Sequence, residues 1–167
     1  MNENDFKKTY DGFTKFVLWG TVAVIALLII LAITLLYNLK TNKMIVGSIK
    51  ENLEFEKRVS ITPETAKNII GLGLKVCVEK NYALHLGIYD DEYRKNGVEI
   101  KNSPSEILNS SDLITKVNFP SEEEINILKE DTILIGMLYP SKNKANLNKI
   151  LNKNTKLFSL ELLPRIT

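Results

Sequence analysis

Two basic residues lie where the sequence could build an anion-binding site. Arg58 precedes Val-Ser-Ile-Thr-Pro in the first expected connection from strand to helix, and Lys116 lies near the carboxyl end of a later expected strand. In open α/β sheets, ligands bind at the edge formed by the carboxyl ends of the parallel strands. Two cations that meet there could hold a carboxylate or a phosphate. The alternative is that both residues are solvated surface charges.

Four other motifs favour structural roles. Gly71-Leu-Gly73 follows an expected helix and precedes a strand, the reverse of a dinucleotide fingerprint, and is interpreted as a helix stop. His85 is the only histidine, with no partner residues for a metal site, and Cys77 lies between two valines, as a small core residue would. The run 122–124 of three glutamates begins a helix, where negative charge complements the dipole. The sequence therefore predicts no metal site and assigns no catalytic residue.

Short apolar runs alternate with helical patterns over residues 44–167. Thr62 suits a helix N-cap, and Pro63 suits the first helical position. The expected strands cover 44–49, 74–79, 98–100, 112–117, 132–138 and 156–160; helices begin at 62–64 and cover 104–109, 120–129 and 144–151. This alternation predicts parallel strands joined by crossovers, and therefore an α/β layered fold. The runs 112–117 and 133–138 are typical of central strands buried on both faces.

A long apolar run precedes this domain. No charged residue interrupts 16–39, and about 20 apolar residues suffice to cross a bilayer as a helix. The chain is therefore predicted to have an N-terminal tail over 1–15, a single transmembrane helix over 16–39 and a soluble domain over 44–167. A cleaved signal peptide is disfavoured because the run is too long. The lysines on the two sides balance, so the positive-inside rule does not decide the orientation.

Composition excludes several classes of function. The net charge of +2 comes from 22 basic and 20 acidic residues spread along 167 positions, without the basic stripe that nucleic-acid binding requires. We therefore expect no nucleic-acid partner. A single cysteine cannot form an internal disulfide, which favours the reducing side of a membrane.

Four motifs of the soluble domain resemble a known family in order and spacing: Met44-Ile-Val-Gly-Ser-Ile-Lys-Glu, Glu56-Lys-Arg-Val-Ser-Ile-Thr-Pro-Glu, Asp112-Leu-Ile-Thr-Lys-Val-Asn-Phe-Pro and Leu162-Leu-Pro-Arg-Ile. They are similar to the N-terminal domain shared by alanine dehydrogenase and the α subunit of NAD(P) transhydrogenase. The resemblance implies a Rossmann-like (flavodoxin-like), three-layer domain. Met137-Leu-Tyr-Pro-Ser looks more like the transhydrogenase branch, because alanine dehydrogenases carry an acid-base histidine where this chain has Tyr139.

The resemblance also implies site residues, cofactors and partners. Arg58, Lys116 and Tyr139 match anion-pocket positions, and Arg165 matches an arginine at the nicotinamide end of bound NAD(H). The implied activity is hydride transfer from NADH to NADP⁺ coupled to proton translocation. NAD would bind the complete protein, and NADP a partner component. The expected partners are the transhydrogenase β subunit, the remaining α-subunit domains and further copies of the chain. The separate GxGxxG domain of the family is absent, so we expect the domain to be incomplete at its C-terminal end and inactive alone.

A second resemblance covers residues 5–36. Tyr10-Asp-Gly-Phe, followed by Trp19-Gly-Thr and a lone apolar helix, is similar to subunit IV of bacterial aa3-type cytochrome c oxidase. This implies an accessory membrane element and an association with the oxidase; a plain membrane anchor is the alternative. A true fusion, a merged gene model and a fragment stay open. We expect the chain in the bacterial inner (cytoplasmic) membrane with the soluble domain in the cytoplasm, although oxidase subunit IV is expected to place its C-terminus outside.

Two alternative functions stay open beside the transhydrogenase. One is an alanine-dehydrogenase-like oxidoreductase, which the replacement of the histidine by Tyr139 disfavours. The other is a non-catalytic accessory subunit of cytochrome c oxidase.

Overall fold

The computed structural model describes residues 3–41 and 43–164, with side chains described for 13–35 and 43–164. The chain divides into two units, Met1–Asn42 and Lys43–Thr167, which are considered separately.

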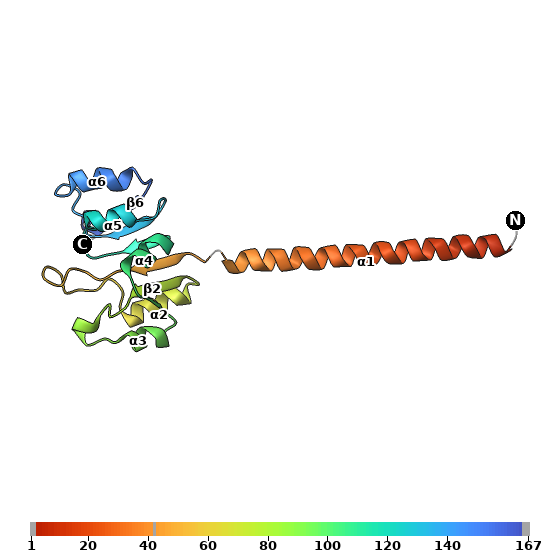
Figure 1. Ribbon diagram of the computed structural model, residues 1–167, viewed down its shortest axis with the longest axis horizontal. Helices are drawn as coiled ribbons and strands as arrows, with labels where there is room; N and C mark the ends of the chain where they lie inside the picture. The colour runs from red at the N-terminus through yellow and green to blue at the C-terminus, as the bar shows by residue number, and fades with distance from the viewer. Residues whose placement is uncertain (1–2, 42, 165–167) are drawn as a thin grey trace. The chain divides into compact units, whose positions relative to one another are not determined.

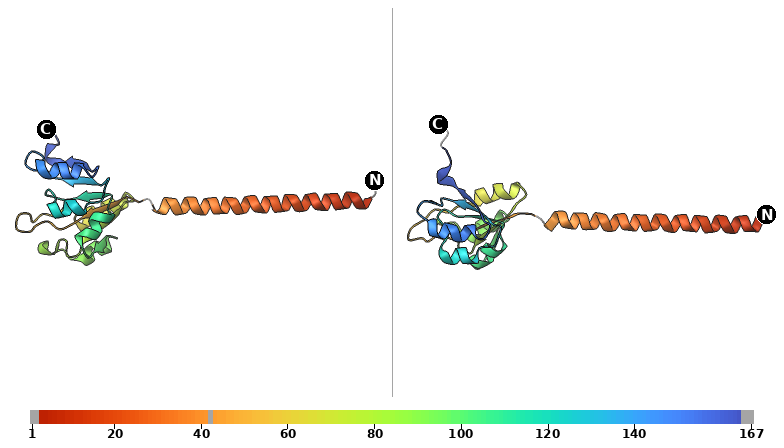
Figure 2. Two further views of the ribbon diagram at one scale, coloured as in Figure 1. Left: turned by 45° about the horizontal axis from the view of Figure 1, so that its top comes forward. Right: turned by 90° about the horizontal axis from the view of Figure 1, so that it is seen from above.

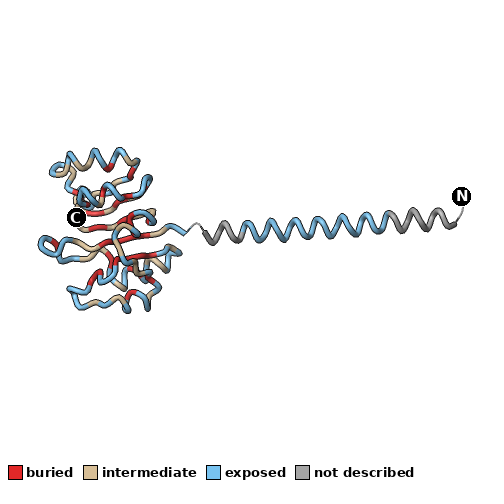
Figure 3. The backbone as a smooth tube through the Cα atoms, viewed as in Figure 1, coloured by how far each residue is buried: buried red, intermediate tan, exposed pale blue. Residues whose placement is uncertain are grey.

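The first unit is one helix, α1 (Glu3–Thr41), so residues 3–15 of the expected tail are helical as well. Its stretch Phe13–Leu35 has a mean hydropathy of 2.9, and its length and composition are those of a membrane-spanning helix. Two threonines of the apolar run bond to the backbone of their own helix: Thr21 Oγ1 donates to Leu18 O (2.9 Å) and Thr34 Oγ1 to Leu31 O (2.8 Å). The described side chains of this helix are exposed (Figure 3), as a lipid-facing helix requires.

The second unit is built on a six-stranded, fully parallel sheet in the order β3-β2-β1-β4-β5-β6 (Figure 1). The strands are β1 (Ile45–Ser48), β2 (Lys75–Glu79), β3 (Glu99–Lys101), β4 (Leu113–Thr115), β5 (Ile133–Gly136) and β6 (Lys156–Ser159). The helices are α2 (Pro63–Gly71), α3 (Asp90–Lys95), α4 (Pro104–Ser110), α5 (Glu122–Ile127) and α6 (Lys144–Leu151), with short 3₁₀ turns η1 (Leu84–Leu86) and η2 (Leu160–Leu162). The predicted α/β fold is confirmed; α3 and the two 3₁₀ turns are additions.

Local signals set the helix starts. Thr62 caps α2, because its side chain accepts from the Thr65 amide and Pro63 follows at the first helical position. Ser121 and Glu124 form a reciprocal capping box on α5. Gly73 has a φ of 88° just beyond α2, which confirms the helix stop.

The side chains of β1, β2 and β4 alternate between two apolar cores on opposite faces of the sheet. Val76 and Val78 of β2 pack in one core with residues of α2 and α3, whereas Cys77 packs in the other with residues of α4, α5 and α6. Helices therefore cover both faces, which gives three layers (Figure 2). The two cores explain why the middle of β2, residues 76–78, is apolar.

Strand β5 differs from the expectation that both of its faces are buried. Leu134 is fully buried, but Ile133 and Ile135 are only half-buried. Within residues 43–164, α2 and α3 pack on one face of the sheet, over β1, β2 and β3. Helices α5 and α6 pack on the opposite face, in the core that contains Leu134 of β5. The prediction of a strand buried on both faces was wrong here, because an apolar run does not reveal that the strand lies second from the edge.

Gly47 of β1 permits α4 to approach the sheet. A Cβ at this position would lie 2.2 Å from Ser111 Oγ and 2.6 Å from Ile107 Cγ2. We expect Gly47→Ala to lower the free energy of unfolding by about 1–3 kcal/mol, because the neighbours must shift to accept the methyl group. Urea unfolding of the full chain in detergent, followed by near-UV circular dichroism of the tyrosines, measures the change. Gly71→Ala is the control, since nothing lies within 4 Å of its Cβ position; an equal loss in both variants would contradict the prediction.

Candidate functional site

A buried hydroxyl cluster anchors the loop that carries Arg58. Ser48 Oγ, at the end of β1, lies 2.7 Å from Tyr82 Oη and 2.8 Å from Ser60 Oγ. The Ser60 amide donates to Tyr82 Oη (3.0 Å), and Ser60 Oγ donates to Thr115 O (3.1 Å) at the end of β4. The serine of the Arg-Val-Ser-Ile-Thr-Pro motif thus joins the ends of β1 and β4, and the loop is fixed to the carboxyl edge of the sheet.

Arg58 is held by a neighbouring carboxylate. Its Nε donates to Glu56 Oε1 (2.9 Å) and its Nη2 to Glu56 Oε2 (2.7 Å), a two-point pair, and the Arg58 amide also donates to Oε1 (2.8 Å). These bonds from Arg58 lower the pKa of Glu56 to about 2. The pKa of Arg58 is raised, chiefly by Glu56, with smaller electrostatic contributions from Tyr139 and Glu51. Arg58 therefore lies within electrostatic range of Tyr139, with 65% of its side chain exposed.

Lys116 follows β4 and is almost fully buried. Its Nζ donates to both carboxylate oxygens of Glu124, at 2.9 and 2.8 Å, and lies 3.9 Å from Glu51 Oε2. Only 5% of the Lys116 side chain and 5% of the Glu51 side chain are exposed. Burial raises the pKa of Glu51, against the attraction of Lys116 and the bond that its Oε1 accepts from the Val117 amide (2.7 Å). One ammonium thus lies between two buried or half-buried carboxyl groups.

A cleft of about 220 Å³ opens beside Lys116. Its lining is mixed polar and aromatic: Glu51, Asn52, Phe55, Lys116, Asn118, Phe119, Ser121 and Glu124. An anion that enters the cleft must compete with the Glu124 carboxylate for Lys116. Arg58 and Tyr139 are not among the lining residues, so the structure places the predicted pocket residues at one sheet edge but not in one cavity.

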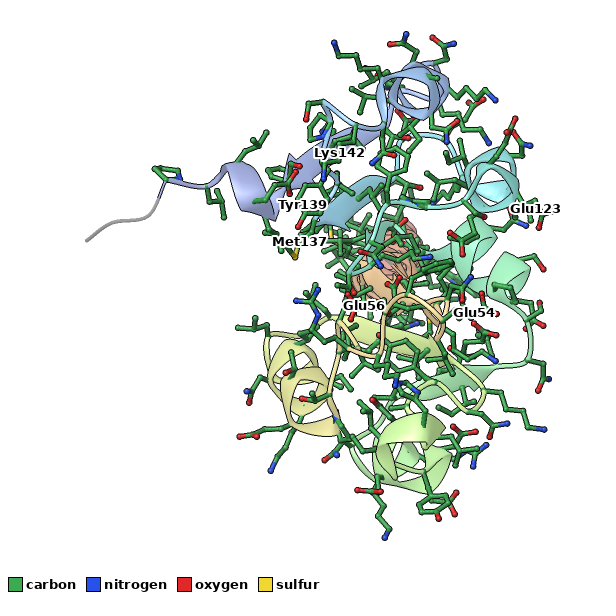
Figure 4. The ribbon with its side chains drawn as sticks, turned by 90° about the vertical axis from the view of Figure 1, so that its left-hand side faces the viewer. Glu54, Glu56, Glu123, Met137, Tyr139 and Lys142 are labelled. Carbon is green, nitrogen blue, oxygen red and sulfur yellow. The ribbon has the colours of Figure 1, made fainter. Side chains whose placement is uncertain are left out.

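Tyr139 lies beyond the end of β5 in an unusual backbone conformation. Its φ is 42°, in the left-handed region, and its side chain is exposed, with Lys142 Nζ 5.3 Å from the centre of the ring. Its amide donates to Glu161 Oε1 (2.6 Å). Figure 4 shows Tyr139, Met137 and Lys142 in the same region of the domain, away from Glu123 on α5. Arg165, the predicted cofactor-binding residue, lies outside the described residues.

The secondary candidates have the structural roles expected of them. Cys77 is buried in the core, where burial raises the pKa of its thiol. His85 is exposed, and its Nε2 lies 2.7 Å from Lys57 O. Among the residues with described side chains, no group of three or more histidine, cysteine, aspartate or glutamate residues is arranged to hold a metal ion.

Sequence reasoning missed the acidic partners of the site. Glu124 was interpreted only as a helix cap, and no role was assigned to Glu51, Glu56 or Glu161. Glu56 lies two residues from the arginine that it holds, a spacing that could have signalled the pair. Glu51 accepts from the Val117 amide, 66 residues away, and Glu161 accepts from the Tyr139 amide, 22 residues away. A local sequence pattern does not predict contacts at such separations.

An open parallel α/β sheet with charged groups gathered at its carboxyl edge defines the class of α/β ligand-binding domains. Residues 47–167 match the sequence profile of one family in this class, described as alanine dehydrogenase/PNT, N-terminal domain. The chain belongs to that family.

Curated relatives and solved structures agree with the assignment. The first portion of NAD(P) transhydrogenase subunit alpha from Rickettsia prowazekii is 36% identical over 129 residues, which cover 74% of this chain and 33% of that protein. Alanine dehydrogenase 1 of Staphylococcus aureus is 35% identical over 107 residues, covering 64% of this chain and 28% of the dehydrogenase. The crystal structure of a transhydrogenase from Sinorhizobium meliloti is similar with a TM-score of 0.69 and 32% identity, over 74% of this chain and 36% of that one. The chain thus spans about a third of the length of these relatives.

The first unit has a separate similarity. Residues 2–35 match the profile described as bacterial aa3 type cytochrome c oxidase subunit IV. Both resemblances inferred from the sequence motifs are therefore confirmed at the level of family profiles.

The buried Lys116 cluster predicts a large effect on stability. Lys116→Met leaves Glu51 and Glu124 without their shared cation, and we expect a loss of about 3–5 kcal/mol in the free energy of unfolding. The double variant Lys116→Met/Glu124→Gln should recover some of this loss, because it also removes an uncompensated charge. Urea unfolding measures both, with the exposed Lys57→Met as control; an unchanged midpoint for Lys116→Met would contradict a buried ion cluster.

The Glu56–Arg58 pair predicts a pH-dependent contribution. The pKa of Glu56 is about 2 in the folded protein, below its ordinary value of 4.5, so the pair stabilises the fold above pH 4.5 and is lost as the pH falls toward 2. We expect Glu56→Gln to cost about 1 kcal/mol at pH 7, since Arg58 is largely exposed, and nothing near pH 2. Thermal unfolding at a series of pH values measures the difference. Glu54→Gln, at an exposed position two residues away, is the matched control.

Proposed function

We propose that this chain supplies the N-terminal lobe of the NAD(H)-binding α subunit of a proton-translocating NAD(P)⁺ transhydrogenase. In the complete protein, hydride would pass from NADH on this subunit to NADP⁺ on another component. The observation that carries the proposal is the match of 74% of the chain to a transhydrogenase α subunit at 36% identity. Tyr139, at the position where the resemblance implies a histidine in alanine dehydrogenases, supports the transhydrogenase branch.

The residues of the edge fit one side of a nucleotide cleft rather than a complete site. The β1–α2 loop, residues 49–62, contains no glycine, so it lacks the turn that brings backbone amides against a diphosphate. Arg58 and Lys116 are each paired with a carboxylate of the chain. When NAD is bound, the nicotinamide supplies the hydride chemistry. The domain would bound the cleft through Arg58 and Tyr139, with Arg165 at the nicotinamide side, while the phosphates bind another domain.

The proposed assembly follows from the length of the relatives. This chain spans about a third of the Rickettsia relative, which supports the remaining α-subunit domains as partners. A β subunit and further copies of the chain are proposed from the family resemblance. The proposed location is the bacterial inner membrane, with the sheet unit in the cytoplasm. The composition of α1 and its match to an oxidase subunit support membrane association, and also support an accessory role beside cytochrome c oxidase as a second candidate.

An alanine-dehydrogenase-like activity is the remaining candidate. Its support is the 35% identity to a dehydrogenase over 64% of the chain. Tyr139 weighs against it, because a phenol does not exchange protons near neutral pH as an imidazole does.

A domain replacement tests the proposal. Residues 47–167 would replace the matched segment of the Rickettsia prowazekii α subunit, and the chimera would be assayed with its partner components for hydride transfer from NADH to an NADP⁺ analogue. We expect the chimera to transfer hydride at a rate within about tenfold of that of the parent subunit. This corresponds to a change of less than about 1.4 kcal/mol in the activation free energy. The control chimera carries Arg58→Ala and should transfer hydride more slowly than the unaltered chimera.

The same chimera separates the alternatives. Alanine-dependent reduction of NAD⁺ would favour the dehydrogenase and overturn the proposal. Absence of both activities in a folded chimera that still binds its partners would also overturn it. Recovery of the native chain with a haem-copper oxidase, and not with transhydrogenase components, would support the accessory role.

A further inference from the structure

The backbone amides of Leu138 and Tyr139 follow the last residues of β5 that pair with neighbouring strands. The last paired residues of β5 and β6 are Gly136 and Ser159, and the chain then turns away from β5 into η2. On the other side, the last bond to the β4 segment is from the Met137 amide to Val117 O (3.0 Å). The amides of Leu138 and Tyr139 therefore meet no neighbouring strand.

The Glu161 carboxylate takes the place of the missing strand. Its Oε1 accepts from the Tyr139 amide at 2.6 Å, and its Oε2 accepts from the Leu138 amide at 3.1 Å. Ser159 Oγ also donates to Oε1, at 2.5 Å. A single carboxylate thus accepts hydrogen bonds from two consecutive backbone amides. Because the acceptor is charged, these bonds are stronger than bonds between neutral groups.

This contact holds an unfavourable backbone conformation. Tyr139 has a Cβ and a φ of 42°, a region that non-glycine residues rarely adopt. On the acceptor side of the turn, the Lys142 amide donates to Tyr139 O (2.9 Å) and Asn143 Nδ2 donates to Leu138 O (2.9 Å). Both the amides and the carbonyl groups of the turn therefore have hydrogen-bond partners. Among the described residues, Glu161 is the partner of the two amides.

Glu161 is ionised at neutral pH. Burial tends to raise its pKa, but the bonds from Ser159 and from the backbone amides outweigh burial, and the net pKa is lowered. Within residues 43–164, no lysine or arginine forms an ion pair with Glu161, so its main stabilising partners are these donors. The charged groups near the Tyr139 ring are Lys142 and Arg58, with Glu56 paired to Arg58.

We propose that Glu161 is a positioning residue of the candidate site, whose carboxylate fixes the Leu138–Tyr139 turn and thereby the position of the Tyr139 ring. The inference rests on the proposed function only in treating Tyr139 as a member of the nucleotide-facing edge. Because Glu161 follows β6 and Tyr139 follows β5, the contact makes the end of β6 and the tyrosine turn one rigid element. The position of the ring then depends on a residue that need not touch a ligand.

The test uses the full chain in detergent with 3-fluorotyrosine in place of tyrosine. Tyr139→Phe assigns the ¹⁹F signal of position 139, and hydrogen exchange followed by mass spectrometry reports on the segment 137–141. The variants are Glu161→Gln, which removes the charge, and Glu161→Asp, which keeps it. Glu123→Gln, an exposed glutamate on α5, is the matched control.

We expect Glu161→Gln to shift the Tyr139 signal at pH 7 and to speed amide exchange in the segment by at least about tenfold, since bonds to charged groups contribute that much. Glu161→Asp should restore some of both, and Glu123→Gln should change neither. In the unaltered chain, the signal should move only as the pH falls below 4.5 and Glu161 is protonated, because the lowered pKa keeps the contact intact above that value. The Glu161→Gln signal should lack this step, and any remaining step that comes from protonation of Glu56 should disappear in Glu56→Gln.

Three results would overturn the inference. They are an unchanged Tyr139 signal and exchange rate in folded Glu161→Gln, an acid step that is the same in that variant as in the unaltered chain, and equal effects from Glu123→Gln. If Glu161→Gln does not fold, the pH titration of Glu56→Gln decides the matter, because the absence of any acid step there would also overturn the inference. None of the readouts needs a nucleotide or a partner, so failure of the proposed function leaves them interpretable.

Discussion

Strand β1 is the constraint on which the sheet unit depends. It pairs with β2 on one side and β4 on the other, and it packs against an apolar core on each face. The connections leave β1 and β4 in opposite directions, so no helix closes the space between their carboxyl ends, where open α/β sheets bind ligands. Ser48, Ser60 and Thr115 bridge that space with hydrogen bonds. The candidate site therefore lies where the strand order changes direction, between β1 and β4. The loop that carries Arg58 lies over the carboxyl ends of these two strands.

The cations at this edge of the sheet are neutralised by carboxylates of the same chain. Burying an ammonium such as that of Lys116 without a partner is prohibitive, and Glu124 and Glu51 supply the opposite charge. Arg58 is likewise paired, by Glu56. Ligand binding at such an edge exchanges one carboxylate partner for another, so the net gain in affinity is small. This is the energetic expectation for one lobe of a cleft whose phosphate-binding elements belong to another domain.

The features of the structure that the sequence predicted are those with local causes. Thr62-Pro63 and Ser121 start helices through contacts three residues away, and the apolar alternation placed all six strands. The unpredicted features have distant causes. The half-burial of Ile133 and Ile135 depends on which strands α2 and α3 cover, and the roles of Glu51 and Glu161 depend on residues 66 and 22 positions away. Of the site, the sequence could therefore place Arg58 and Lys116 at one edge but could not predict that each cation is already paired.

The backbone of the Tyr139 turn is fixed independently of the side chain that it carries. Glu161 and Asn143 bond to main-chain atoms of Leu138 and Tyr139, so the conformation of the turn does not depend on the side chain at position 139. A tyrosine or a histidine can occupy the same backbone geometry at the same sheet edge. Acid-base chemistry can then be gained or lost by one substitution without altering the sheet, the helices or the paired cations. The difference that the family resemblance implies at position 139 therefore needs no change in the backbone of this sheet edge.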